Sequence, residues 1–377
     1  MSGHERGCHS DRALIWQVSA RVVADSSRCR PYQSPVLDRT LDTSWLAEDP
    51  VPDVNELKVV SPMSFEQLAL HTGVPVPRHL IDTVNKWDQQ ALTPGWLGSL
   101  PATVAQLCDQ WGIELDPVIP ETVVTLVLFG HSPELGEVVI KSSPLADEFL
   151  AEATALRLAA GDGVLRLHDV DFEHSAMVVE RIVPGTQLRD VPMSDEDATR
   201  LAAVKLRAFW RPVDDPTGLH PLRHWMRALF DWTPRPDLLA SDMVERAQEL
   251  ATALLAGSTQ SSLLHGDFQH HNLLQRGSGA WTIVDPKGLH GDPGFDIAAW
   301  MYNPSWVSER DDYLDLASRR IAICSHVWGI PEAELAAWAF VGAVLNACNW
   351  ATSDAAPDGL VWHCVHIAQQ LRTLLRQ

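Results

Sequence analysis

The chain has 377 residues, of which 46% are hydrophobic and 21% are charged, and its formal net charge is −20. This length exceeds what one compact domain usually requires, so we expect two lobes. The acidity disfavours nucleic acid and membranes as partners and suits a cationic small molecule, and the absence of any run of about 18 uncharged apolar residues excludes a transmembrane helix.

Residues 1–62 are predicted to form a disordered extension, because they lack sustained helical or strand periodicity. A native arm, an expression remnant and a reading frame that truly starts at Met63 are all compatible with this segment. The first thirty residues contain scattered charges and no continuous apolar segment, so we expect no secretory signal. The six cysteines show no CxxC spacing, which favours free thiols and a cytoplasmic location.

The next part of the chain alternates helical and strand patterns. Helical patterns cover residues 77–87 and 100–113, and two apolar runs around the turn HSPELGE predict a β-hairpin that ends at Lys141. A further helix is expected over residues 147–161, and Glu152 lies on its apolar face. A carboxylate on such a face requires a cation or donors, and Lys141 is the nearest cation in sequence. A helix-edge glutamate that reaches water is the alternative.

Two more strands are expected within residues 167–183, and the pattern then becomes helical. The first helix of this second part opens with a Ser194 cap and an acidic first turn. The further helical patterns cover residues 222–232, 241–255, 311–328, 332–350 and 360–376. The order of elements predicts an α+β fold, with a strand-rich lobe over residues 63–183 and a helical lobe over residues 184–377.

The segment LLHGDFQHHNLL, residues 263–274, places many polar groups at the edge of an apolar run. Turn residues around Ser278 and the returning strand WTIVD predict a second hairpin. Pairing about this turn puts Asn272 opposite Asp285, and an amide oxygen beside a carboxylate suits Mg²⁺. Asp267 lies in the loop before the hairpin, where it can serve as a base.

The ordered set Lys141, Glu152, Asp267, Asn272 and Asp285 matches what phosphoryl transfer requires. The segments LLHGDFQHHNLL and WTIVDPKGLHGDPGFDIAAW closely resemble the streptomycin 6-kinase and hydroxyurea phosphotransferase branch of the aminoglycoside phosphotransferases. The resemblance implies a protein kinase-like fold, with a β-rich, nucleotide-binding N-lobe over residues 63–183 and a catalytic, acceptor-binding C-lobe over residues 184–377.

The resemblance also implies the roles of individual residues and two cofactors, ATP and Mg²⁺. Asp267 would be the catalytic base, while Asn272 and Asp285 would hold Mg²⁺. Lys141 would bind the α- and β-phosphates of ATP, with Glu152 fixing that lysine. The hinge that meets adenine would lie in residues 177–182, and its four assigned residues are Val179, Glu180, Arg181 and Ile182.

Three neighbours of this set are expected to be structural. Asp296 resembles the aspartate that buttresses the catalytic loop, and His265 is expected to support the same loop. His270 and His271 are interpreted as loop-surface residues, with a substrate wall as the alternative. One departure concerns the phosphate-covering loop, since PVIPETVVTLVLF between Pro117 and Phe129 contains no glycine.

The implied reaction is phosphorylation of a hydroxyl of a cationic aminoglycoside, with streptomycin the first candidate and antibiotic resistance the outcome. Asp267, Asp292, Asp354 and Asp358 are candidates to meet a cationic acceptor, while Trp300 and Trp350 are expected in the core. A metabolic kinase for choline, homoserine or an amino sugar is the alternative. The alternative from a different class of enzyme is a non-haem iron oxygenase, with His265, Asp267 and a remote histidine as ligands. A monomer or homodimer is expected.

Overall fold

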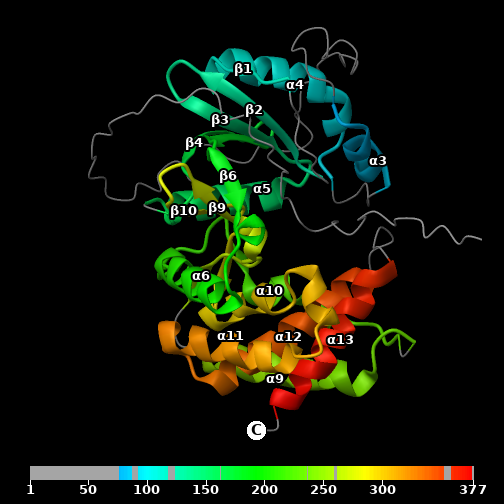
Figure 1. Ribbon diagram of the computed structural model, residues 1–377. Coiled ribbons are helices and arrows are strands. Elements are labelled where there is room, and N and C mark those ends of the chain that lie inside the picture. Colours follow the sequence, from blue (N-terminus) through cyan, green and yellow to red (C-terminus); the bar gives the residue numbers. More distant parts are fainter. Residues whose placement is uncertain are drawn as a thin grey trace, which may run out of the picture.

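The computed structural model describes residues 76–86, 92–117, 124–161, 163–235, 237–258, 261–351 and 358–375. The prediction for residues 1–62 therefore lies outside the described residues. Within them, a part built on one large sheet precedes a part built mainly from helices (Figure 1). None of the described helices is both long and apolar enough to cross a membrane.

The first part is built on a five-stranded sheet with the order β1-β2-β3-β5-β4. Its strands are β1 (Glu114–Leu115), β2 (Leu126–Ser132), β3 (Gly136–Ser142), β4 (Leu167–Asp171) and β5 (Ala176–Glu180). Helices α3 (Arg78–Lys86) and α4 (Trp96–Trp111) share a core with one face, and α5 (Ala146–Leu158) packs on the other. Because both faces are covered, β2 is apolar along nearly its whole length.

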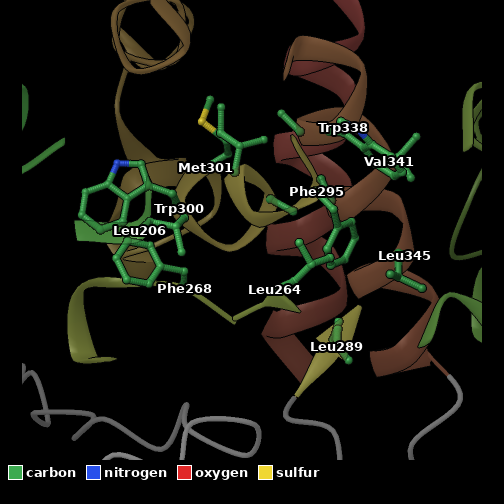
Figure 2. Packing of buried hydrophobic residues seen from close by; sticks show 14 of the residues in the cluster. Leu206, Leu264, Phe268, Leu289, Phe295, Trp300, Met301, Trp338, Val341 and Leu345 are labelled. Carbon is green, nitrogen blue, oxygen red and sulfur yellow. The ribbon is translucent and has the colours of Figure 1, made fainter. Parts of the chain in front are cut away.

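The second part is centred on α12 (Glu332–Ala351), which is apolar on nearly all sides. Around it lie α9 (Ser241–Gly257), α10 (Ile297–Met301), α11 (Tyr313–Trp328) and α13 (Asp358–Leu374) (Figure 1). Figure 2 shows Trp338, Val341 and Leu345 of α12 facing Phe295, with Leu264 and Leu289 beside them. The remaining helices are α6 (Asp195–Phe209), α7 (Leu222–Trp225) and α8 (Arg227–Phe230).

The chain also forms two three-stranded sheets. One has the order β10-β9-β6, with β6 (Pro184–Gln187), β9 (Leu273–Arg276) and β10 (Trp281–Ile283). The other has the order β7-β11-β8, with β7 (His220–Pro221), β8 (Ser262–Leu264) and β11 (Leu289–Gly291). Arg276 of β9 forms a bidentate ion pair with Glu180 at 2.7 and 2.9 Å, which ties this hairpin to the end of β5.

Most expected elements are present. The first hairpin pairs β2 with β3, the Ser194 hydroxyl accepts from the Asp197 N–H at 3.1 Å, and the late helices are α9, α11, α12 and α13. Residues 222–232 differ, because the pattern expected as one helix forms the short α7 and α8, which meet at Met226. The described cysteines are free thiols, three of them buried.

The register of the second hairpin differs from the prediction by one residue. Ile283 pairs with Leu273, so the same register places Val284, and not Asp285, opposite Asn272. The Val284 N–H donates to the Asn272 carbonyl at 3.0 Å. Asp285 leaves the extended conformation, with φ of 61°. The direction of its side chain therefore differs from the one that strand alternation would give.

Candidate active site

The carboxylate of Asp296 fixes the loop between β8 and β9. Asp296 accepts hydrogen bonds from the backbone N–H groups of His265 (2.9 Å) and Gly266 (2.7 Å) and from Trp210 Nε1 (2.8 Å). Burial raises the pKa of Asp296 to about 6, although the three donors favour its ionised form. Gly266 has φ of 82°, and a Cβ there would lie 2.7 Å from a Leu289 methyl, so glycine is required. The loop therefore has one fixed backbone path.

His265 completes this support with both ring nitrogens. Its Nε2 donates to the Val284 carbonyl at 2.9 Å, and its Nδ1 accepts from the Asp267 N–H at 3.3 Å. Burial lowers the pKa of His265 to about 4, which keeps the ring neutral. Because both nitrogens are engaged, His265 is unsuited to bind iron. The part of the chain that the structure describes contains no group of three metal-binding side chains of the His, Cys, Asp or Glu type.

Asp267 projects from this fixed loop. Gln269 Nε2 donates to its two carboxylate oxygens at 3.2 and 3.3 Å, and burial raises its pKa to about 7. Asn272 Nδ2 donates to the Asp267 carbonyl at 2.8 Å, so the amide oxygen of Asn272 is the group left to ligate. A carboxyl with a pKa near neutrality is suited to accept a proton from a substrate hydroxyl.

Three elements bring four charged side chains together near Asp267. Lys141 of β3 forms ion pairs with Glu152 of α5 and, at 2.8 Å, with Asp285 Oδ1. Lys287 Nζ lies 2.9 Å from the other oxygen of Asp285. Burial alone would raise the pKa of Asp285, but the two ammonium groups hold it well below its usual range. Asp285 is therefore ionised.

These groups line one pocket between the large sheet, α5 and the loop that follows β10. Its wall contains two lysines, three carboxylates and the apolar or small side chains around them: Thr125, Lys141, Ser143, Glu148, Phe149, Glu152, Met177, Trp225, Asp285, Pro286 and Lys287. Buried opposite charges around one cavity provide fixed electrostatic groups for a charged ligand.

The residues assigned to the hinge are not equivalent. Val179 and Glu180 pair within the sheet, and the N–H groups of Glu180 and Arg181 donate to Arg166 and Glu137 at 2.9 Å each. Within the described ranges, Ile182 is the one of the four whose backbone makes no hydrogen bond to another segment. The strand pattern did not reveal this difference, because it depends on pairing with distant segments.

Other assigned residues lie apart from the pocket. His270 and His271, expected on the loop surface, are each 5% exposed: His270 stacks on Trp300 at 3.8 Å, and Arg189 donates to His271 at 3.1 Å. Asp292 is also buried and caps its own turn by accepting from the Gly294 N–H at 2.8 Å, so it does not face an acceptor. Trp300 and Trp350 are buried as expected, and the side chains of Asp354 and Asp358 lie outside the described residues.

The chain is similar to known proteins over most of its length. Residues 110–354 match the model of the aminoglycoside/hydroxyurea antibiotic resistance kinases. The chain belongs to this kinase family. It is 31% identical to a streptomycin 6-kinase of Streptomyces glaucescens over 285 residues, 74% of this chain and 91% of the relative. It is 26% identical to a hydroxyurea phosphotransferase of Kitasatospora aureofaciens over 74% of this chain and 81% of the relative.

Solved structures with the same architecture are more distant in sequence. A choline kinase from Streptococcus pneumoniae has a TM-score of 0.51 at 12% identity and covers 72% of this kinase and 98% of its own chain. An amicoumacin kinase in complex with AMP-PNP, Ca²⁺ and Ami has a TM-score of 0.52 at 12% identity, with 78% and 96% covered. The predicted two-lobed, protein kinase-like α+β fold is confirmed. The iron oxygenase alternative is not supported by any of these relationships.

Proposed function

We propose that this kinase transfers the γ-phosphate of ATP to a hydroxyl of a cationic aminoglycoside of the streptomycin type and thereby confers resistance. The observation that carries the proposal is the convergence of Lys141, Glu152 and Asp285 on one pocket beside the half-buried Asp267. The similarity to a streptomycin 6-kinase and the net charge of −20 support a cationic acceptor.

The residues present fit a magnesium ion. Asp285 is ionised and offers carboxylate oxygens, and the amide of Asn272 is oriented by its own donation to the Asp267 carbonyl, so that its oxygen is available. We assign Asn272 and Asp285 as its ligands. When bound, the ion neutralises charge on the phosphates of ATP.

The remaining roles follow from position. Lys141, fixed by Glu152, binds the α- and β-phosphates, and Ile182 is the best placed of the four hinge residues to meet adenine, since its backbone is not used elsewhere. We divide the chain accordingly into a nucleotide-binding lobe up to Val183 and a catalytic, acceptor-binding lobe from Pro184.

Asp267 acts on the acceptor. Its carboxylate accepts the proton of the attacking hydroxyl as the new bond to the γ-phosphorus forms and the bond to the β,γ-bridging oxygen breaks, which releases ADP. Gln269 holds the carboxylate and His265 holds the backbone N–H, so the base is positioned before the acceptor arrives.

The experiment is a screen of the full-length protein with ATP and Mg²⁺ against streptomycin, other aminoglycosides, hydroxyurea, choline, homoserine and amino sugars. We expect ADP release and a phosphorylated product with streptomycin, and a rise in streptomycin resistance when the gene is expressed in a susceptible bacterium. Turnover confined to choline, homoserine or a simple amino sugar would contradict the proposal and favour a metabolic kinase.

A further inference from the structure

Asp285 is bound by two lysines, one on each carboxylate oxygen. Lys141 Nζ lies 2.8 Å from Oδ1, and Lys287 Nζ lies 2.9 Å from Oδ2. The chain contains few lysines, so the meeting of two at one carboxylate is not a feature of a lysine-rich surface. The roles assigned so far explain Lys141 and leave Lys287 without a function.

The two lysines differ in their other partners. Lys141 also binds Glu152, so it keeps an anionic partner when Asp285 engages a metal ion. Within the described part of the chain, the ammonium group of Lys287 has no hydrogen-bond partner other than Asp285. Binding of Mg²⁺ at Asp285 would therefore free Lys287 in particular, inside a pocket where an unpaired ammonium is costly.

The backbone holds Lys287 between the acceptor side and the metal side of the site. Its N–H donates to the His265 carbonyl at 2.7 Å, and its Cβ lies 3.1 Å from the Cβ that a side chain at Gly266 would have. A Cβ at the following Gly288 would lie 2.1 Å from the Ala151 carbonyl, so this loop is clamped against α5. Lys287 is thus rigidly anchored beside the residue that precedes Asp267, while its ammonium group reaches Asp285.

The transferred phosphate must pass between these two carboxylates, because the acceptor hydroxyl is held at Asp267 and the metal at Asp285. In many kinases, backbone N–H groups of a glycine-rich loop cover this phosphate. The segment between Pro117 and Phe129 contains no glycine. A fixed positive charge near the equatorial phosphate oxygens, over which charge is spread in the transition state, would serve in place of such a loop.

We propose that Lys287 is a catalytic residue that binds the γ-phosphate of ATP during transfer. The inference rests on the proposed kinase reaction and adds to it a residue for the transferred group. As the bond to the β,γ-bridging oxygen breaks, Lys287 stays with the phosphate that moves to the acceptor, while Lys141 stays with ADP. The proton of the acceptor still passes to Asp267.

The test compares ATP and ADP binding in the full-length protein with Mg²⁺, so that it does not depend on turnover. Lys287→Met is expected to weaken ATP binding by about tenfold and ADP binding by less than about twofold, since ADP lacks the γ-phosphate. The same variant is expected to lower kcat by about 10²-fold or more, as for loss of one transition-state donor. Lys287→Arg should recover part of both. The matched control is Lys205→Met, which removes a half-buried lysine of α6 outside the pocket and should change neither ratio.

Equal weakening of ATP and ADP binding, or no change in either, would show that Lys287 serves only to neutralise Asp285. If Lys287→Met does not fold, wild-type protein with ¹³C-labelled lysine gives the same answer. The Lys287 side-chain NMR signal should then move with a non-hydrolysable ATP analogue and not with ADP, and its failure to distinguish them would overturn the proposal. If no acceptor is phosphorylated but the nucleotides still differ, the proposed acceptor is wrong and the role of Lys287 stands.

Discussion

Two buried clusters of charge in this kinase are built on opposite plans. Arg320 of α11 is fully buried and donates to both oxygens of Asp195 and to the carbonyls of Trp300 and Asn303. Its guanidinium also lies 5.6 Å from the centre of the Trp300 ring. Each nitrogen of this rigid fork donates to a fixed acceptor, so the cluster joins α6, α10 and α11 in one arrangement.

The cluster at Asp285 uses ammonium groups, which are compact charges with rotatable donors. Its lysines share one carboxylate, and the backbone of Asp285 has φ of 61°, a conformation that among described non-glycine residues is found elsewhere only at Ser175. Strained backbone at such a position is typical of functional sites. The difference indicates that the Arg320 cluster stabilises the fold, whereas the Asp285 cluster suits the proposed exchange of a lysine for a metal ion or a phosphate.

The largest expected effects come from substitutions in the candidate active site, at Asp267 and at Asp285. Asp267→Ala should lower kcat by at least about 10²-fold, because the acceptor loses its base, while ATP affinity in the presence of Mg²⁺ changes less than about twofold. Asp285→Ala should weaken nucleotide binding and turnover together, since it removes a proposed metal ligand. Steady-state kinetics and calorimetric titration separate the two, and more than about a tenth of wild-type activity in both variants would contradict the assignments.

The next prediction breaks the fixed cluster. Arg320→Met should lower the free energy of unfolding by about 3–5 kcal/mol, because it leaves Asp195 and two buried carbonyls without their donors. ATP affinity of the folded protein should stay unchanged. Denaturant unfolding and nucleotide titration measure the two effects.

A neighbouring arginine supplies the control for that experiment. Arg319 pairs with Glu196 at 2.9 Å, but the side chains are 44% and 43% exposed, so Arg319→Met should cost less than about 1 kcal/mol. Equal losses at both positions would mean that the buried donors of Arg320 add nothing to the fold.

A smaller effect sharpens the account of the Asp285 cluster. Among the described residues, Glu152→Gln leaves Lys141 with Asp285 as its one anionic partner, so a metal ion at Asp285 would have to displace a more tightly held lysine. The Mg²⁺ concentration for half-maximal ATP binding should rise by about three- to tenfold, comparable to one hydrogen bond. Glu137→Gln, at an exposed position of β3, is the control. An unchanged Mg²⁺ requirement would separate Glu152 from the exchange.

The same contrast explains which features were predictable from the sequence. The first hairpin, the Ser194 cap and α12 follow from local patterns, since their residues and neighbours lie within one segment. Asp267, Asn272 and Asp285 could be proposed as site residues from the sequence because the motifs that resemble the family keep them in one short stretch. The predicted hairpin register was wrong by one residue, because the observed pairs are centred on Ser278 and therefore place Val284 opposite Asn272. The direction of the Asp285 side chain depends on its positive φ, which no side-chain pattern reveals.

Features that join distant segments were missed. His270 was expected at the loop surface because nothing near it in sequence announces its stacking on Trp300, thirty positions later. The break between α7 and α8 at Met226 is likewise not encoded by a proline or glycine there. Lys287 lies within the motif DPKG, but the sequence does not show that it shares the Asp285 carboxylate with Lys141, because β3 and the loop after β10 are far apart in the chain.

The smallest expected effect concerns a half-buried pair of a histidine and an aspartate in the turn between β4 and β5. His174 Nδ1 lies 3.0 Å from Asp171 Oδ1, and this hydrogen bond raises the pKa of His174 above its ordinary value of 6.5. The stabilisation is therefore fully present below the unfolded pKa and is lost as pH rises through the folded pKa. His174→Ala should cost about 1 kcal/mol at pH 6 and less at pH 9, measured by denaturant unfolding.

His131→Ala removes a more exposed pair with Glu137, at 3.2 Å, and should cost less than His174→Ala at pH 6. A cost for His174→Ala that is the same at both pH values would show that the ring packs in this turn without contributing its charge.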